Sequence, residues 1–389
     1  MADWLQGPYV YALYDSYGFE KEQIAHLFIA GFGSSMLFGT FVGALADKYG
    51  RKRMSVAYAV FYGLACVTKL YNNFALLLFG RVLSGIATSL LFSSFESWMV
   101  SEHQKFQFAP AWLSQTFSHA TLGNGVIAIG SGLMASYVAD QYGFVAPFMV
   151  ALVILALCGV VVLSMWEENF GDAKIDVQGG FRNAIQALQN DTRVPLLGLV
   201  QSLFEGAMYT FVFMWTPALE AAVRAAQPGT EDVLPFGLIF ACFMVAIMIG
   251  SGLFSALIAR QFAAEVIAVF NFVAATLALL CATVFVDQPV IVFGSFLLFE
   301  VCCGVYFPCQ GTLRGKYIPE DCRAAIMNFF RIPLNFLVVL VLVKVGSLEN
   351  HHVFAAIVLW LALAAALQIV IVMRRGEGSD KNASAARGH

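Results

Sequence analysis

Seven ionisable side chains lie within the long apolar runs of this 389-residue chain. A charged group in hydrocarbon costs several kcal/mol, so each one needs a partner, water or a function. Seven exceed what an inert helical bundle would carry, which indicates a polar pathway; the structural alternative is that they form clamps between helices. The seven residues are Asp3, Arg81, Glu96, His119, Glu205, Glu300 and Arg331.

Arg331, in the stretch NFFRIPLN, has the side chain best suited to bind an oxyanion. Its guanidinium offers a rigid fork of donors and stays charged when it is desolvated. Pro333 and Asn335 follow closely and would loosen the helix, which exposes backbone groups to a ligand. The alternative is a purely structural salt bridge from Arg331 to Glu300 or Glu205.

Three further residues complete the predicted substrate-binding set. His119 lies in TFSHATLGN and titrates near neutral pH, so it could carry a proton or donate to an anion; a satisfied core histidine is the alternative. Asn124 ends the same stretch, and Tyr209 lies in FEGAMYTF.

Asp3, Glu205 and Glu300 form a set of carboxylates predicted to lie near the middle of the bilayer. Because desolvation raises the pKa of a carboxyl group, such residues can bind and release a proton during a transport cycle. The apolar runs contain four acids against two arginines and a histidine. An anion would therefore be disfavoured unless some acids are protonated, and we hypothesise proton-coupled anion uptake.

The composition is that of a polytopic membrane protein. Hydrophobic residues make up 60% and charged residues only 12%, against about 25% charged in a soluble domain. The mean hydropathy is +0.76. No basic tract or zinc-type spacing suggests nucleic acid, a metal or a cofactor, and the eight cysteines fall mostly in apolar runs as packing residues.

The apolar runs predict an all-α fold with eleven complete spans and one partial span, which is the first. Its apolar part, from Asp3 to Tyr14, is shorter than the about 20 residues needed to cross a bilayer, so we expect a truncated first helix. The complete runs cover residues 23–46, 54–71, 74–99, 111–139, 144–165, 194–219, 234–259, 263–286, 289–312, 323–346 and 352–373. The predicted organisation is a first six-helix half (1–165), a cytoplasmic connection with a short amphipathic helix (166–193), a second half (194–374) and a disordered cytoplasmic tail (375–389).

The positive charges test this count of spans. Four basic residues crowd into the short segment GALADKYGRKR, at residues 43–53, which marks it as a cytoplasmic loop. Alternation from this loop places sixteen of the 22 Lys and Arg residues in inward loops and the tail, Arg314 among them, and two lie within apolar runs. The four on the outward side are Lys21, Lys69, Arg224 and Lys344. One span more or fewer would reverse every later loop, so the charges support twelve spans with both termini of the full-length form in the cytoplasm.

The two halves show a faint repeat, as in secondary transporters built around a midplane cavity. Asp3 and Glu205 are each followed by aromatic and small residues, and both lie about 16 Å from the outer helix end. His119 and Arg331 lie at matching places, about 12 Å from the inner helix starts.

Arg81 and Glu96 are predicted to lie on one helix, about 22 Å apart, so they cannot pair with each other. Arg81 has Gly85 and other small residues nearby, which permit close helix approach and favour a helix contact or a gating role over ligand binding. Glu96 lies near the inner helix end, as a cytoplasmic gate or an interfacial residue.

The segment GALADKYGRKR resembles the loop between the second and third helices of the major facilitator superfamily, through Gly43, Asp47, Gly50 and Arg51. Arg81 with Gly85 resembles a motif in the fourth helix of that superfamily. Stretches at 3–14, 90–103, 203–219 and 304–335 are similar to the molybdate-anion transporter family over nearly the whole chain.

The resemblance implies a major facilitator fold that takes up molybdate across the plasma membrane, with the substrate between the halves. It also implies that Asp47 and Arg51 lock the inner helix ends. The equivalent stretch of the second half, ALIARQ, lacks the acid and the Gly-Arg pair, so any such lock is one-sided.

These observations predict a monomeric secondary transporter for an oxyanion, and three other interpretations remain open at this point. Residue spacing alone does not separate molybdate from sulfate, phosphate or an organic anion. The same fold could move a neutral solute such as a sugar, or serve as a non-transporting scaffold or sensor. An enzyme is not expected, because no nucleophile triad, HExxH motif or phosphate-binding glycine loop occurs.

Overall fold

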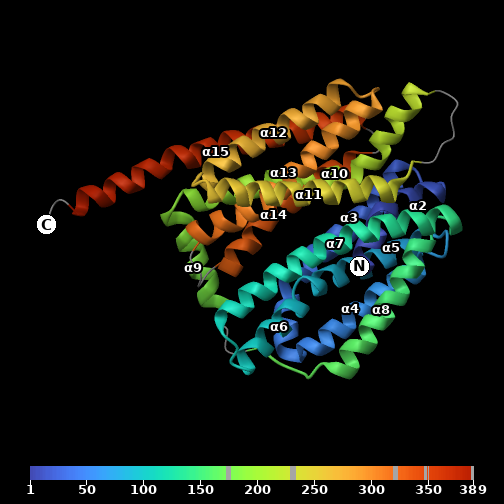
Figure 1. Ribbon diagram of the computed structural model, residues 1–389, viewed down its shortest axis with the longest axis horizontal. Coiled ribbons are helices and arrows are strands. Elements are labelled where there is room, and N and C mark those ends of the chain that lie inside the picture. The colour runs from blue at the N-terminus through green and yellow to red at the C-terminus, as the bar shows by residue number, and fades with distance from the viewer. Residues whose placement is uncertain (172–176, 228–233, 319–322, 346–347, 349, 387–389) are drawn as a thin grey trace. The chain divides into compact units, whose positions relative to one another are not determined.

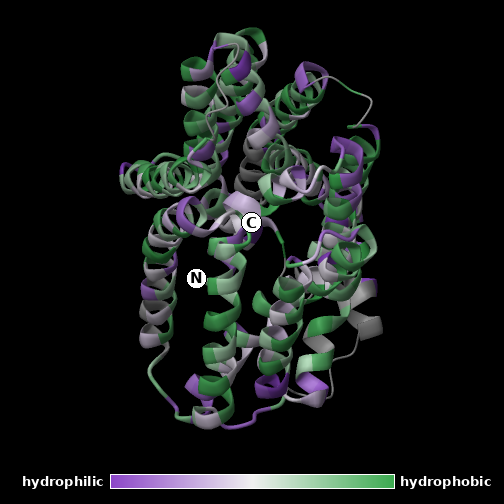
Figure 2. Cartoon of the chain, turned by 90° about the vertical axis from the view of Figure 1, so that its right-hand side faces the viewer, coloured by the Kyte–Doolittle hydropathy of each residue, from purple (hydrophilic) through white to green (hydrophobic). Residues whose placement is uncertain are grey.

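The computed structural model describes the backbone of residues 1–171, 177–227, 234–318, 323–345, 348 and 350–386. This part of the chain is helical apart from turns and short connections, and it contains no strand. Figure 2 shows hydrophobic residues along the lengths of the helices, with hydrophilic residues gathered near their ends. The all-α prediction is therefore confirmed.

Eleven of the described helices have 18 residues or more, which matches the eleven complete spans expected. Within the described residues, eight helical segments are long and apolar enough to cross a membrane, by length and composition alone. The eleven are α3 (Lys21–Tyr49), α4 (Arg51–Thr68), α5 (Phe74–Leu91), α7 (Pro110–Tyr142), α8 (Ala146–Met165), α10 (Arg193–Ala226), α11 (Phe236–Ala259), α12 (Ala264–Val284), α13 (Pro289–Tyr317), α14 (Arg323–Lys344) and α15 (Asn350–Ala386).

Short helical pieces form the beginning of the chain, where one partial helix was expected, and the connection between the halves. The chain begins with α1 (Ala2–Gln6), a 3₁₀ turn η1 (Gly7–Tyr9) and α2 (Val10–Ser16). The connection between the halves contains α9 (Val177–Asn190), the amphipathic helix expected there. Helix α15 continues to Ala386, so residues for which the sequence predicted a disordered tail extend this helix.

One predicted helix is divided in two. The run expected at 74–99 forms α5 and then α6 (Ser94–Lys105), which are separated by a turn at Phe92 and Ser93. At this turn Ser93 Oγ donates to the carbonyl of Ser89 at 2.8 Å, the kind of side-chain bond that competes with helical bonding. Arg81 and Glu96 therefore lie on different helices, contrary to the expectation.

The chain divides into two compact units. The first unit comprises Met1–Ile175, Val233–Met244 and Leu342–Ser347. Within it, α4 packs against α5 and α8, and α3 packs against α5 (Figure 1). Helix α1 packs against α7 and α8. Close backbone contact joins α3 and α5: a Cβ atom added at Gly85 would lie 2.3 Å from the carbonyl oxygen of Gly31. Gly85 thus permits the approach that its position predicted.

The second unit comprises Asp176–Asp232, Val245–Val341 and Leu348–His389. Helix α12 packs against α13 and α15, and α10 packs against α13 and α15 (Figure 1). An aromatic cluster fills this core, in which Phe204 of α10 stacks on Tyr306 of α13 with ring centroids 4.1 Å apart. This packing fixes the position of the Tyr306 side chain.

Candidate functional site

Glu205 lies at the centre of a polar cluster in the second unit. Its Oε1 accepts a hydrogen bond from Tyr306 Oη at 3.0 Å. Its carboxyl also hydrogen-bonds with Gln201, one turn earlier on α10. The residue is half-buried among apolar helices. Its two partners, on α10 and α13, set the orientation of the carboxyl group.

Two arginines lie close enough to Glu205 to act on it electrostatically, Arg314 of α13 and Arg331 of α14. Arg331, which is exposed, also interacts electrostatically with the half-buried Tyr209. Within the described residues neither arginine forms an ion pair with a carboxylate. The salt bridge considered for Arg331, to Glu300 or to Glu205, is absent from this part of the chain.

The local structure around Arg331 differs from the expectation in one respect. Pro333 lies inside α14, as predicted, and removes a backbone donor there. Asn335 Nδ2, however, donates to the carbonyl of Arg331 at 2.5 Å. The amide therefore satisfies a backbone group of its own helix.

Glu300 lies on α13, six residues before Tyr306, and is buried with 8% exposure. Its carboxyl hydrogen-bonds with the Cys303 thiol of the same helix. Among the described ion pairs none involves Glu300, so this acid is buried without a cation. Such a group persists in an apolar core most readily when it carries a proton.

In the first unit Asp3 and Arg81 share a second polar cluster. Asp3 Oδ1 accepts a hydrogen bond from Tyr62 Oη at 2.5 Å, and Arg81 interacts with Asp3 electrostatically. The Arg81 Nε donates to the carbonyl of Leu27 at 3.2 Å, and its guanidinium lies 5.0 Å from the Phe28 ring centroid. Arg81 thus contacts the facing helix α3 through its backbone and an aromatic ring.

Asn124 accepts a hydrogen bond at Oδ1 from Trp4 Nε1, 2.9 Å away, which joins α7 to the first helix. His119 lies one turn earlier on α7 and is exposed, as is Glu96 at the start of α6. The structure therefore brings Asp3 together with Arg81, and Glu205 with Arg331 and Tyr209. Asp3, His119 and Asn124 belong to the first unit, whereas Arg331, Asn335, Tyr209, Glu205 and Glu300 belong to the second.

The predicted lock residues meet where α3 ends and α4 begins. Arg51 donates from Nη2 and Nε to Asp47 Oδ1, at 2.8 and 3.2 Å. Its Nη1 also donates to the carbonyl of Ser97 on α6 at 3.1 Å. Gly43 lies in α3, and its surroundings fall outside the described part. Asp47 and Arg51 thus tie α3, α4 and α6 together at this end.

A segment distant in sequence caps the same junction. The Glu168 carboxylate accepts from the backbone N–H groups of Lys52 at 2.8 Å and Arg53 at 3.3 Å. A carboxylate here satisfies unpaired donors of the first turn and complements the helix dipole. Gly50 has a φ of +104° and permits this approach, because a Cβ atom there would lie 2.4 Å from the Glu168 carboxyl carbon. Sequence reasoning missed this cap, since nothing local marks a contact across more than 110 residues.

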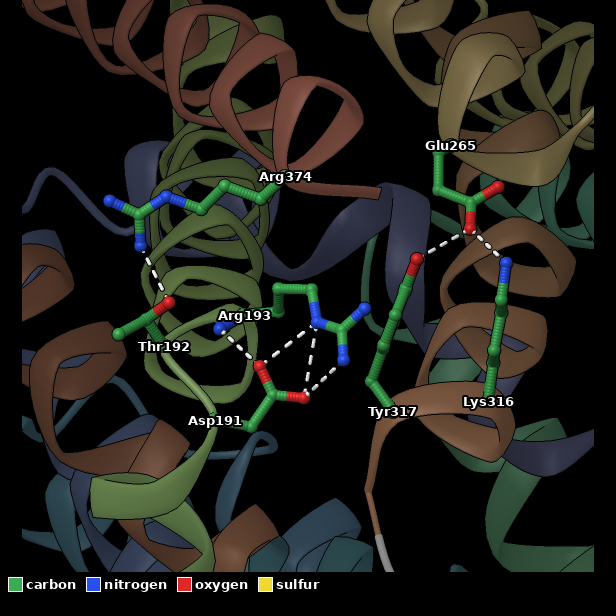
Figure 3. A network of polar contacts seen from close by, with 7 residues as sticks. All are labelled: Asp191, Thr192, Arg193, Glu265, Lys316, Tyr317 and Arg374. Atoms are coloured by element: carbon green, nitrogen blue, oxygen red, sulfur yellow. Dashed lines mark hydrogen bonds and ion pairs between the residues drawn. The ribbon is translucent and has the colours of Figure 1, made fainter. Parts of the chain in front are cut away.

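At the end of the second unit where α10 begins and α13 ends, a different network occurs (Figure 3). The Glu265 carboxylate, 2% exposed, pairs with Lys316 and accepts from Tyr317 Oη at 2.6 Å. Arg193 pairs with Asp191 at 2.8 Å, an interaction that lowers the pKa of Asp191. Glu265 lies in the first turn of α12, shortly after the stretch ALIARQ, which lacks the Gly-Arg pair.

Comparisons with known proteins agree with this architecture. A family model described as sugar transporters with 12 transmembrane segments matches residues 1–306. Among solved structures, the nucleoside transporter NupG superposes with a TM-score of 0.75 at 12% identity, covering 95% of each chain. A D-xylose-proton symporter superposes with a TM-score of 0.69 at 10% identity, covering 94% of this chain and 95% of its own. These two likenesses show the major facilitator fold alone.

Two relatives are much more similar in sequence. The molybdate-anion transporter of Takifugu rubripes is 34% identical over 100% of this chain and 88% of its own length. The molybdate-anion transporter of Xenopus tropicalis is 33% identical over 96% of this chain and 83% of its own. The chain therefore belongs to the major facilitator superfamily and, within it, to the family of molybdate-anion transporters.

Proposed function

We propose that this membrane transporter takes up molybdate across the plasma membrane by alternating access, coupled to protons. The observation that carries the proposal is the Arg331 guanidinium. This group lies on α14, away from the helix ends, and its charge acts electrostatically on Glu205. It forms no ion pair in the described part of the chain. Molybdate is a tetrahedral dianion, which suits the rigid donor fork of an arginine.

We assign substrate binding also to His119, Asn124, Tyr209 and Asn335. Each of these side chains can donate a hydrogen bond to an oxyanion. The family name of the relatives supports molybdate over sulfate or phosphate.

Proton coupling is assigned to Asp3, Glu205 and Glu300. Each lies among apolar helices, where the neutral form of a carboxyl group is favoured over the charged form. A proton on Glu205 would remove a negative charge that competes with the substrate for Arg331. Uptake of a dianion together with protons also reduces the charge carried through the membrane.

Alternating access is assigned to the lock at residues 47–53. The ion pair of Asp47 with Arg51 and the Glu168 cap hold one end of the first unit together. In our proposal this end faces the cytoplasm, as the positive-inside distribution of Lys and Arg indicates, and both termini lie there. Glu96, near this end, serves the gate, and the transporter works as a monomer.

The test is molybdate accumulation at varied external pH in cells that lack their own uptake system. We expect uptake to rise as external pH falls, and Glu205→Gln and Glu300→Gln to flatten this dependence. Uptake independent of pH, with wild-type rates in both variants, would remove proton coupling. A chain that accumulates no more molybdate than the empty-vector control would refute the transport proposal itself.

A second candidate is a facilitator for a neutral solute such as a sugar. It is favoured by the description of the matching family model as sugar transporters. In that case Arg331 has only a structural role, and Arg331→Ala would leave anion uptake unchanged. Cells that express the wild type would also take up sugar at a measurable rate.

A further inference from the structure

Arg314 is a second guanidinium that sequence reasoning placed in a loop with other basic residues. The structure places it inside α13, three residues before the helix ends at Tyr317. It is half-buried, and its side chain makes one described hydrogen bond, from Nη1 to Gln201 Oε1 at 3.3 Å. Arg314 therefore projects from α13 toward α10 instead of into a surface loop.

The hydrogen-bonding capacity of Arg314 and Arg331 is almost unused. A guanidinium carries five N–H donors, so the pair has about ten. Within the described residues, only the bond from Arg314 to Gln201 uses one of them. By contrast, Arg51 and Arg193 each pair with a carboxylate at 2.8 Å. Two guanidiniums with so many unpaired N–H donors are costly among apolar helices unless water or a ligand accepts hydrogen bonds from them.

Both guanidiniums lie within electrostatic range of the same group. Their charges act on the single carboxyl group of Glu205, which Tyr306 holds from one side at 3.0 Å. Counted by helical rise, Arg314 lies about 5 Å from the end of α13, Arg331 about 12 Å into α14, and Glu205 about 18 Å into α10. All three helix ends are at the same end of the unit, so both cations lie on one side of Glu205.

The charges do not balance in the absence of a ligand. Two cations act on one carboxyl group, so the cluster has a surplus of positive charge even when Glu205 is ionised. In a medium of low dielectric constant this surplus favours binding of an anion, and a dianion more than a monoanion.

We propose that Arg314 is a second anion ligand, and that Arg314 and Arg331 together form a two-guanidinium site that selects doubly charged tetrahedral oxyanions. This inference rests on the proposed function and adds to it the residue that sets charge selectivity. Gln201 is a positioning residue, because its Oε1 holds the Arg314 guanidinium beside Glu205.

The test compares two competitors of the same shape that differ by one charge. Radiolabelled molybdate uptake is measured in the wild type, in Arg314→Gln and in Arg260→Gln, with tungstate (a dianion) or perrhenate (a monoanion) added. Arg260, an exposed arginine that follows α11, is the matched control. For the wild type and the control, we expect tungstate to compete at concentrations at least about tenfold lower than perrhenate. In Arg314→Gln the half-saturation concentration for molybdate should rise at least about tenfold, and tungstate should lose its advantage.

A second variant guards against misfolding of the first. Gln201→Glu keeps the size of the side chain but places a carboxylate at the Arg314 Nη1 group. The new ion pair would occupy and neutralise Arg314, so the preference for tungstate should fall in this variant too.

The outcomes separate the two claims. If Arg331→Gln abolishes uptake while Arg314→Gln and Gln201→Glu keep wild-type affinity and the preference for tungstate, the inference about Arg314 is wrong and the proposed function stands. If the wild type accumulates no molybdate, both are wrong.

Discussion

Replacing Gly304 with alanine should weaken the packing between α11 and α13. A Cβ atom at this position would lie 2.1 Å from the carbonyl oxygen of Ile247, and 2.8 and 2.9 Å from its carbonyl carbon and Cα atom. All three are backbone atoms, so no rotamer change can relieve the clash. An ordinary contact needs about 3.5 Å, so the two helices would have to separate by about 1.4 Å.

We expect this overpacking to lower the free energy of unfolding by about 2 kcal/mol, within the usual range for inserting a methyl group into a packed core. For a unit of this size the loss corresponds to a fall in Tm of about 4–8 °C. The shift also matters for function, because Gly304 lies two residues from Tyr306, which holds Glu205.

The assay is thermal unfolding of the purified protein in detergent, beside a control on the same helix. Gly294 also lies in α13, and a Cβ atom there would meet nothing within 4 Å. Gly294→Ala should be neutral or stabilise the protein by up to about 1 kcal/mol, because alanine is the better helix former. Equal Tm values for the two variants would refute the argument that α11 and α13 touch through their backbones.

Two further predictions concern the helix ends. In thermal unfolding, Gly50→Ala should lower the Tm more than Gly143→Ala. Both glycines have a positive φ, but only Gly50 lies against a carboxylate, that of Glu168. A larger fall in Tm for Gly143→Ala would contradict the proposed cap. The hydrogen bond from Arg193 lowers the pKa of Asp191 below its usual 3.8, so its contribution to stability is present above that pH and is lost as the pH falls through the lowered value. The Tm difference between wild type and Asp191→Asn, worth up to about 1 kcal/mol for so exposed a pair, should therefore shrink from pH 6 to pH 3; a constant difference would exclude the ion pair.

The sequence predicted the helices well because their signals are local. Apolar runs long enough to cross a bilayer define α12, observed at Ala264–Val284 against an expected 263–286. The amphipathic α9 was also found from its own residues. The division between α5 and α6 was missed, since apolar residues continue through the turn at Phe92 and Ser93 and hydropathy alone does not register the break.

The polar contacts were harder to predict because they join distant parts of the chain. Lys69 was counted as an outward-facing surface charge, but it is 1% exposed and its Nζ lies 4.9 Å from the Phe148 ring centroid. Arg314 was likewise assigned to a loop, although α13 extends five residues beyond the predicted end at 312. The residues around a cationic side chain near a helix end do not reveal whether that side chain faces solvent or a buried carboxyl group.

The central claim is that Arg331 binds a tetrahedral oxyanion, and calorimetric titration of the purified protein with molybdate tests it without the complications of uptake. We expect saturable binding by the wild type and at least about tenfold weaker binding by Arg331→Gln, as the loss of a charge-assisted contact implies. Equal affinities in the two proteins, or a wild type that binds no molybdate, would contradict the account.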